Sequence, residues 1–111
     1  MPNLKVYVDE AIWTERRDAL AQALAPIRSM LCERLDVDVS ACQLALLPVH
    51  GLPDQPLVNA EIFVLARPER TRAMLEAVCR TLRDRLSEAG GGARTAVRCD
   101  GLDPRSYFAI K

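Results

Sequence analysis

The chain has 111 residues, half of them hydrophobic, which is enough for one compact domain with its own core and too apolar for a disordered segment. Fifteen basic residues balance fifteen acidic ones, so charge gives no reason to expect nucleic acid or a membrane as a partner. The sequence shows neither a signal-peptide pattern nor an apolar run near the roughly 20 residues of a membrane span, and we expect a cytoplasmic protein.

The first half of the chain predicts a strand, a helix and a second strand. Apolar and polar residues alternate from Asn3 to Asp9, as they do in a half-buried strand. Thr14 is the expected N-cap of a helix whose apolar residues recur at helical spacing, and Pro26 is expected to kink that helix. Residues 36–40 end the helix, and the dense apolar run at 41–47 predicts a buried strand.

The second half repeats the order of strand and helix. A loop is expected at 48–56, where three prolines and one glycine occur. A strand is then predicted at 62–66, and Pro68 suits the first turn of the helix that follows, because that position needs no N–H donor. The three consecutive glycines at 90–92 end this second helix.

The last twenty residues complete the second unit. Alternation at 95–99 predicts a fourth strand. A turn is expected at 100–105, and a short terminal strand at 107–110.

A duplicated β-α-β unit accounts for this order. Val6-Tyr7-Val8 matches Ile62-Phe63-Val64, and we place the two repeats at about 1–48 and 58–111 of a single domain. Each helix should cross between parallel strands with the usual right hand. The predicted fold is a two-layer α+β sandwich, in which a four-stranded mixed sheet carries two helices on one face. Oligomerisation would cover the other face and protect the strand edges.

The cysteines and the single histidine do not form a metal-binding pattern. No two cysteines form a CxxC pair, and His50 completes no zinc spacing. We therefore predict no metal and no other cofactor, and four reduced thiols. The cysteines are Cys32, Cys42, Cys79 and Cys99.

Pro2 directly follows the initiator methionine. Processing normally removes a methionine that precedes a small residue, so Pro2 is expected to be the first residue of the mature protein. Its nitrogen would then be a titratable secondary amine, which no internal proline has. Near cations or apolar walls such an amine can lose its proton near neutral pH and act as a base.

With Pro2 leading straight into a strand, and with two β-α-β units in its length, the chain resembles the tautomerase superfamily. Its branches include 4-oxalocrotonate tautomerase, 5-carboxymethyl-2-hydroxymuconate isomerase and macrophage migration inhibitory factor. The resemblance covers essentially the whole chain. It runs from Pro2 to Leu20, continues through Leu35-Asp36 and the strand from Ala41, and includes the junction at 60–75.

The resemblance implies an activity and a set of site residues. Pro2 would be the catalytic general base, moving a proton in a small enol or keto carboxylic acid within a homotrimer. Arg67 stands at the second strand–helix junction, with Arg70 one turn on, and both would bind the substrate carboxylate, which suits a planar guanidinium. Ile12 occupies the corresponding first junction, where short tautomerases have an arginine. Gln43 aligns with a second family arginine and could donate a hydrogen bond.

Two further residues are candidates for binding the substrate. His50 has a pKa range suited to acid–base work, although an exposed loop histidine is the alternative. Tyr107 belongs to a C-terminal segment that helps to close the site in related trimers, and it could donate to a substrate oxygen. The alternative for Tyr107 is an aromatic pair packed with Phe108.

Two other functions remain open at this level. A protonated Pro2 amine would instead suit dehalogenation, hydration or decarboxylation, which also occur in the superfamily. A non-catalytic ferredoxin-like module for ligand binding or oligomerisation shares the outline of four strands and two helices. In that case Pro2 would be incidental, and Met1 could stay attached.

Overall fold

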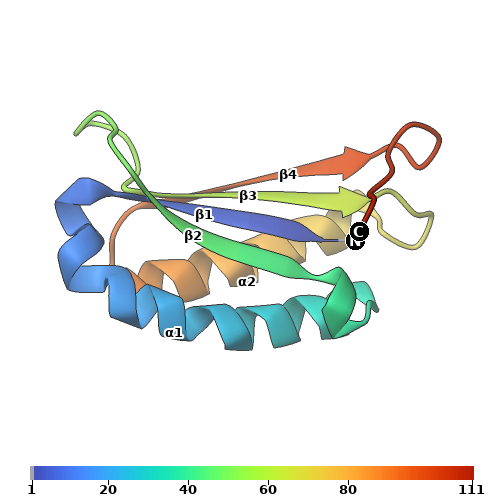
Figure 1. The fold of residues 1–111 in the computed structure, drawn as a ribbon, viewed down its shortest axis with the longest axis horizontal. Helices are drawn as coiled ribbons and strands as arrows, with labels where there is room; N and C mark the ends of the chain where they lie inside the picture. Colours follow the sequence, from blue (N-terminus) through green and yellow to red (C-terminus); the bar gives the residue numbers. More distant parts are fainter. Residues whose placement is uncertain (1) are drawn as a thin grey trace.

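The computed structural model describes residues 2–111, which form one mixed sheet and two long helices (Figure 1). The strands are β1 (Asn3–Asp9), β2 (Gln43–Val49), β3 (Val58–Leu65) and β4 (Thr95–Leu102). The helices are α1 (Glu10–Leu35) and α2 (Arg72–Ala89), and a short 3-10 helix, η1, covers Val39–Ala41. Both long helices lie on the same face of the sheet, so the predicted two-layer α+β fold is confirmed.

The order of the strands in the sheet is β2-β1-β3-β4. β1 pairs with β2 in parallel, and β3 pairs with β4 in parallel. The two units meet at the centre, where β1 and β3 are antiparallel with Lys5 opposite Glu61. Because these central strands run in opposite directions, the start of β1 lies beside the end of β3.

The core lies between the sheet and the helices. Alternate residues of the two central strands are buried there, as the period of a strand requires. They pack against an apolar stripe from each helix. The fully buried large side chains are Leu4, Val6, Val8, Leu20, Ile27, Leu31, Val58, Ile62, Val64, Val78, Leu82 and Leu86. Neither helix of the described chain is both long and apolar enough to cross a membrane.

Helix α1 begins at Glu10, so the predicted N-cap at Thr14 is wrong. Asp9 caps the helix instead, and its carboxylate accepts hydrogen bonds from the Ala11 N–H at 2.9 Å and the Gly51 N–H at 3.1 Å. The last residue of β1 therefore also starts the helix, with no loop between them. The helix continues through Pro26, which lies on its exposed side.

Helix α2 begins later than predicted. Its N-cap is Thr71, whose hydroxyl accepts from the Met74 N–H at 3.2 Å, so Pro68 lies in the preceding turn and not in the first helical turn. The end of the helix is as predicted. Gly91 and Gly92 follow it with φ of 71° and 85°, a region that favours glycine.

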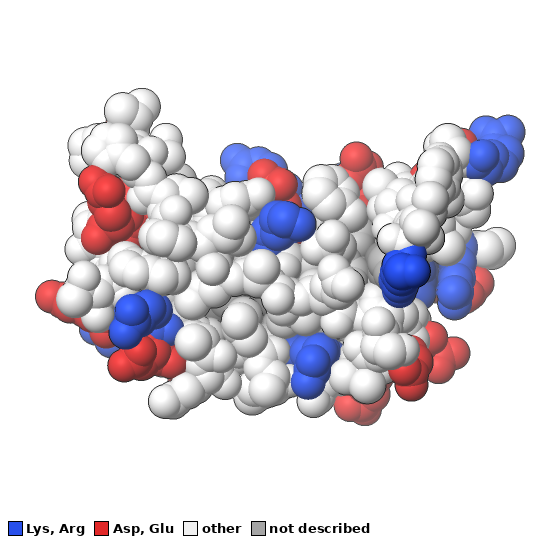
Figure 2. Space-filling view, viewed as in Figure 1, with Lys and Arg blue, Asp and Glu red and all other residues white. Residues whose placement is uncertain are grey.

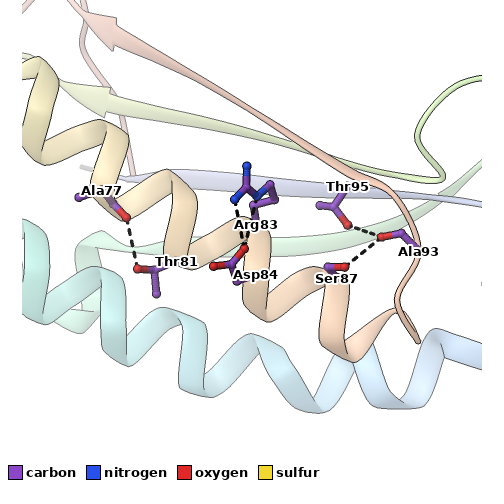
Figure 3. Close-up of polar contacts among 7 residues, drawn as sticks. All are labelled: Ala77, Thr81, Arg83, Asp84, Ser87, Ala93 and Thr95. Carbon is purple, nitrogen blue, oxygen red and sulfur yellow. Dashed lines mark hydrogen bonds and ion pairs between the residues drawn. The ribbon is translucent and has the colours of Figure 1, made fainter.

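Hydroxyl groups close the connection from α2 to β4 (Figure 3). Ser87 Oγ and Thr95 Oγ1 both donate to the Ala93 carbonyl, at 3.2 and 3.0 Å. The end of the helix and the start of the strand are thus tied to one peptide group. This contact holds the edge strand β4 against α2.

The strand ends differ from the predictions in several places. β4 extends to Leu102, into the segment where a turn was predicted. β2 extends through Pro48, which an edge strand tolerates because one of its sides forms no ladder. β3 begins at Val58, four residues before the predicted start. In the described chain, residues 107–110 form no strand. The Tyr107 N–H instead donates to the Asp103 carbonyl at 2.9 Å, which closes a turn.

Candidate active site

The sheet topology brings Pro2, Gln43 and the β3–α2 turn to one end of the molecule (Figure 1). β1 and β2 begin at this end, and β3 and β4 finish there. The Gln43 N–H donates to the Pro2 carbonyl at 3.1 Å. Asn3 pairs with Phe63, so continuing the antiparallel register places Pro2 across from Val64. Three separate segments of the chain therefore meet here.

Pro2 itself is buried. Its carbonyl is held by the edge strand β2, which fixes the backbone at the start of β1. The Pro2 nitrogen is an amide in the 111-residue chain and becomes a secondary amine only when Met1 is removed.

Arg67 follows β3 and is exposed. It opens the turn before α2, in which the Arg70 N–H donates to the Arg67 carbonyl at 3.0 Å. Within the described residues, no hydrogen bond or ion pair holds the Arg67 side chain. Its guanidinium is therefore available to an anion at the end of the sheet that carries Pro2.

Arg70 has a different environment, although it is only three residues away. Only 7% of it is exposed, and its guanidinium donates to the Leu65 carbonyl at 2.6 Å and the Leu35 carbonyl at 3.0 Å. Burial lowers the pKa of Arg70, and the nearby charge of Arg67 lowers it further. Arg70 thus links the last residue of β3 to the last residue of α1. This geometry favours a role in positioning the turn over direct binding of a substrate.

Gln43 and Tyr107 also lie at the Pro2 end. The side chain of Gln43 is exposed on the edge strand, on the same sheet face as Asn3, its partner in β1. Tyr107 is half-buried in the segment that follows β4.

His50 and Ile12 lie at the opposite end of the same chain. His50 follows β2, and its Nδ1 lies 2.6 Å from Glu10 Oε1 at the start of α1. β1 separates this end from Pro2 by about 20 Å, at roughly 3.3 Å per residue. Ile12 is half-buried against the core in the first turn of α1. Neither residue is brought to the Pro2 of its own chain.

The uncovered sheet face adds two residues that the sequence analysis did not select. Asn3 and Phe63 stand beside Gln43 in one cross-strand row next to Pro2. Phe63 is 36% exposed, which is high for a large apolar residue of a central strand. The β-alternation could have placed both on this face, but only the pairing of β1 with β3 places them side by side.

One cavity among the described residues lies away from Pro2, which is absent from its lining. It has a volume of about 610 Å³ and lies between α2 and β4, with Arg70 in its wall. On the face shown in Figure 2, acidic and basic side chains are interspersed. The outline in Figure 2 is concave between two raised ends, which in Figure 1 are loop 50–57 and the segment after β4.

Comparison with known proteins gives a match in structure only. No protein-family model matches the sequence, and no curated protein matches it. A native fused 4-OT has a TM-score of 0.75 at 13% identity, over 96% of this chain and 91% of that one. A macrophage migration inhibitory factor-like protein from Entamoeba histolytica has a TM-score of 0.69 at 13% identity, over 98% and 95% of the chains.

A malonate semialdehyde decarboxylase is also similar, with a TM-score of 0.60 at 17% identity over 95% of this chain and 86% of that one. These three proteins are members of the tautomerase superfamily. Identities this low relate the structures by fold alone. The chain has the fold of the tautomerase superfamily.

Proposed function

We propose that this protein is a proline-based tautomerase or isomerase that moves a proton in a small enol or keto carboxylic acid. The meeting of Pro2, Gln43 and the turn that bears Arg67 at one end of the sheet is the observation that supports it most. These residues come from three distant parts of the chain. A base, a hydrogen-bond donor and a cation are the groups that such a reaction needs.

In this mechanism Pro2 acts after Met1 has been removed. The buried secondary amine is neutral and takes a proton from the enol hydroxyl or from the carbon next to the carbonyl. It then returns a proton to a second carbon, which completes the shift of the double bond. Arg67 binds the carboxylate at two points and stabilises the negative charge that develops on the enolate. Gln43 and Tyr107 donate to the remaining substrate oxygens.

We further propose that the site is completed in a homotrimer. Fused 4-OT proteins of this fold have been solved as trimers. Here one sheet face is uncovered in the single chain, and β2 and β4 are edge strands. His50 lies far from the Pro2 of its own chain, so it can take part only at the site of a neighbouring subunit. We place the trimer in the cytoplasm, where thiols stay reduced.

The role of Pro2 is tested by mass spectrometry and by kinetics. The intact protein from its native host should lack Met1. With phenylenolpyruvate or 2-hydroxymuconate as substrate, Pro2→Ala should reduce kcat/KM by at least about 10²-fold, the usual scale for a lost general base. Pro53→Ala, an exposed change in loop 50–57, is the matched control and should leave turnover unaltered. Retained Met1, or full activity in Pro2→Ala, would contradict the proposal.

The role of Arg67 is tested against another exposed arginine. Arg67→Ala should raise KM if the guanidinium only binds the carboxylate, and should also lower kcat if it stabilises the enolate. Arg80→Ala, on the exposed side of α2, removes the same charge away from Pro2. Equal effects of the two substitutions would show that net charge, and not the position of Arg67, determines binding.

A second candidate is decarboxylase chemistry, which the similarity to malonate semialdehyde decarboxylase favours. Decarboxylation needs a protonated Pro2 amine, whereas tautomerisation needs a neutral one. Titration of a ¹⁵N-labelled Pro2 nitrogen by NMR separates the two reactions, because a neutral amine at pH 7 supports tautomerisation and a protonated amine supports decarboxylation.

The strand pairing differs from that of a ferredoxin-like module. Such a module has a split β-α-β arrangement, whereas here β1 pairs directly with β2.

A further inference from the structure

A pair of thiols lies between α2 and β4, in the cavity of about 610 Å³ that does not include Pro2. Cys79 of α2 and Cys99 of β4 both line this cavity. Cys79 also borders an adjoining hollow of about 350 Å³ along the same groove. The two cysteines are twenty residues apart in sequence, so only the packing of α2 against β4 brings them together.

The two thiols differ in their access to solvent. Cys99 is exposed on an edge strand, and its pairing with buried Ile62 places it in the row that faces the helices. Cys79 is half-buried on the inner side of α2. Arg72 and Glu76 form an ion pair at 2.8 Å in the wall of the same cavity. A small molecule can therefore reach Cys99 first, with Cys79 behind it.

A hydrogen bond from the Cys79 thiol lowers the pKa of Cys99 to about 7, against the opposing effects of burial and of Asp100. The same hydrogen bond raises the pKa of Cys79, and burial raises it further. The two shifts favour ionisation of Cys99 while Cys79 keeps its proton. A lowered pKa increases the share of Cys99 that is thiolate at neutral pH, and the thiolate is the nucleophilic form of cysteine.

The other two cysteines, Cys32 and Cys42, also lie side by side, but the pKa of Cys42 is not lowered. Cys42 is buried beside Cys32, and burial, followed by the neighbouring thiol, raises the pKa of Cys42 to about 11. Cys99 is thus the exposed thiol with a lowered pKa, whereas Cys42 is buried with a raised pKa, and the 32/42 pair serves as an internal control.

We propose that Cys79 and Cys99 form a dithiol site that reduces small hydroperoxides, with Cys99 as the attacking thiolate and Cys79 as the resolving thiol. The Cys99 sulfur attacks one peroxide oxygen, the O–O bond breaks, and the alkoxide takes a proton from solvent and leaves as an alcohol. Cys99 becomes a sulfenic acid. The Cys79 sulfur then attacks Cys99, an S–S bond forms, the S–O bond breaks, and the Cys79 proton leaves with the hydroxide as water. Two thiols are oxidised to one disulfide, and one hydroperoxide is reduced.

The proposal does not depend on the chemistry of Pro2. It is tested on the full chain with one equivalent of hydrogen peroxide at pH 7, followed by tryptic mapping without reductant. Wild type and the Cys32→Ser/Cys42→Ser control should give peptide 73–80 linked to peptide 99–105. Cys79→Ser should stop at a sulfenic acid that dimedone traps, and Cys99→Ser should give neither product. A wild-type protein that forms no 79–99 link, or that forms it only with glutathione disulfide, overturns the proposal.

Alkylation by iodoacetamide tests the division of roles between the two thiols. Cys99 should react at least about 10²-fold faster than Cys42 at pH 7, with a midpoint near pH 7. Cys79→Ala should move this midpoint upward by at least about one pH unit, because the hydrogen bond to the Cys99 thiolate is lost. Cys42→Ala should leave it in place. An unchanged midpoint in Cys79→Ala overturns the assignment of Cys79 as the partner.

Discussion

At the scale of single residues, Arg67 and Arg70 are the same residue type, but their environments give them different roles. Both lie in the turn between β3 and α2, and both are candidates for the same carboxylate. Arg67 points to solvent, whereas Arg70 donates to the carbonyls that end β3 and α1. Arg70 therefore stabilises the turn that contains Arg67.

Arg70→Ala should therefore lower the free energy of unfolding by about 2–4 kcal/mol, because two hydrogen bonds from a charged group are lost and two carbonyls are left unpaired. Arg67→Ala should change it by no more than about 0.5 kcal/mol, as for an exposed residue. Urea denaturation of both variants measures the difference. Equal stability of the two variants would contradict the structural role of Arg70.

The ion pair of His50 with Glu10 sets a second residue-scale prediction. The hydrogen bond with Glu10 raises the pKa of His50, and the charge of Glu10 adds to this. The stabilisation by this pair is therefore fully present below the unfolded value near 6.5 and is lost as pH rises through the higher folded value. NMR titration of the imidazole should show a midpoint above 6.5 that falls in Glu10→Gln. Glu15→Gln, on an exposed face of α1, should leave the midpoint unchanged.

At the scale of elements, the junction of β1 and α1 is decided by Asp9. Its carboxylate caps the helix and also holds Gly51 at the far end of β2. Thr14 has the residue type of an N-cap but lies inside the helix. Local residue preference predicted an N-cap at Thr14, whereas the observed cap is Asp9, which also holds Gly51, a residue distant in sequence.

Asp9→Ala should cost about 1–2 kcal/mol of stability, the usual range for a lost N-cap. Asp9→Asn should cost less, since an amide oxygen can still accept the Ala11 N–H. Thr14→Ala should be near neutral, because Thr14 is an exposed position within the helix. Thermal unfolding followed by circular dichroism ranks the three variants. A larger loss for Thr14→Ala than for Asp9→Ala would contradict the observed start of α1.

At the scale of the whole molecule, one face of the sheet has no covering layer (Figure 1). Tyr7 of β1 is half-buried on this face, next to the half-buried Leu47 of edge strand β2. Loop 50–57 and the turn after β4 rise on the same side, one at each end of the sheet. This shape suits a face that packs against other copies of the chain.

Leu47→Lys should therefore shift the protein from trimer to monomer in multi-angle light scattering, because a charge is placed on the buried face of the assembly. Ala77→Lys adds the same charge on the exposed side of α2 and should leave the trimer intact. A wild-type protein that is monomeric at micromolar concentration would contradict the proposed assembly.

Much of the fold could be read from the sequence, because the signals for it are local. The alternation of apolar and polar residues predicted β1 at its observed bounds, and the three consecutive glycines predicted the end of α2. Element boundaries were missed where a particular hydrogen bond, distant or local, decides them. Gly51 supports the start of α1, and the Tyr107 hydrogen bond with Asp103 replaces the predicted terminal strand with a turn. The sequence singled out Pro2 by its place after Met1, but it did not predict that Pro2 is buried.

The sequence by itself determined two β-α-β units and the resemblance to tautomerases, since periodicity and the position of Pro2 are properties of neighbouring residues. Only the tertiary structure decided which candidates can act together. The antiparallel pairing of β1 with β3 sets the start of one strand beside the end of the other, which brings the Arg67 turn to Pro2 and leaves His50 at the opposite end. The packing of α2 on β4 likewise places Cys79 and Cys99 in the wall of one cavity, and no spacing in the sequence indicated this pair.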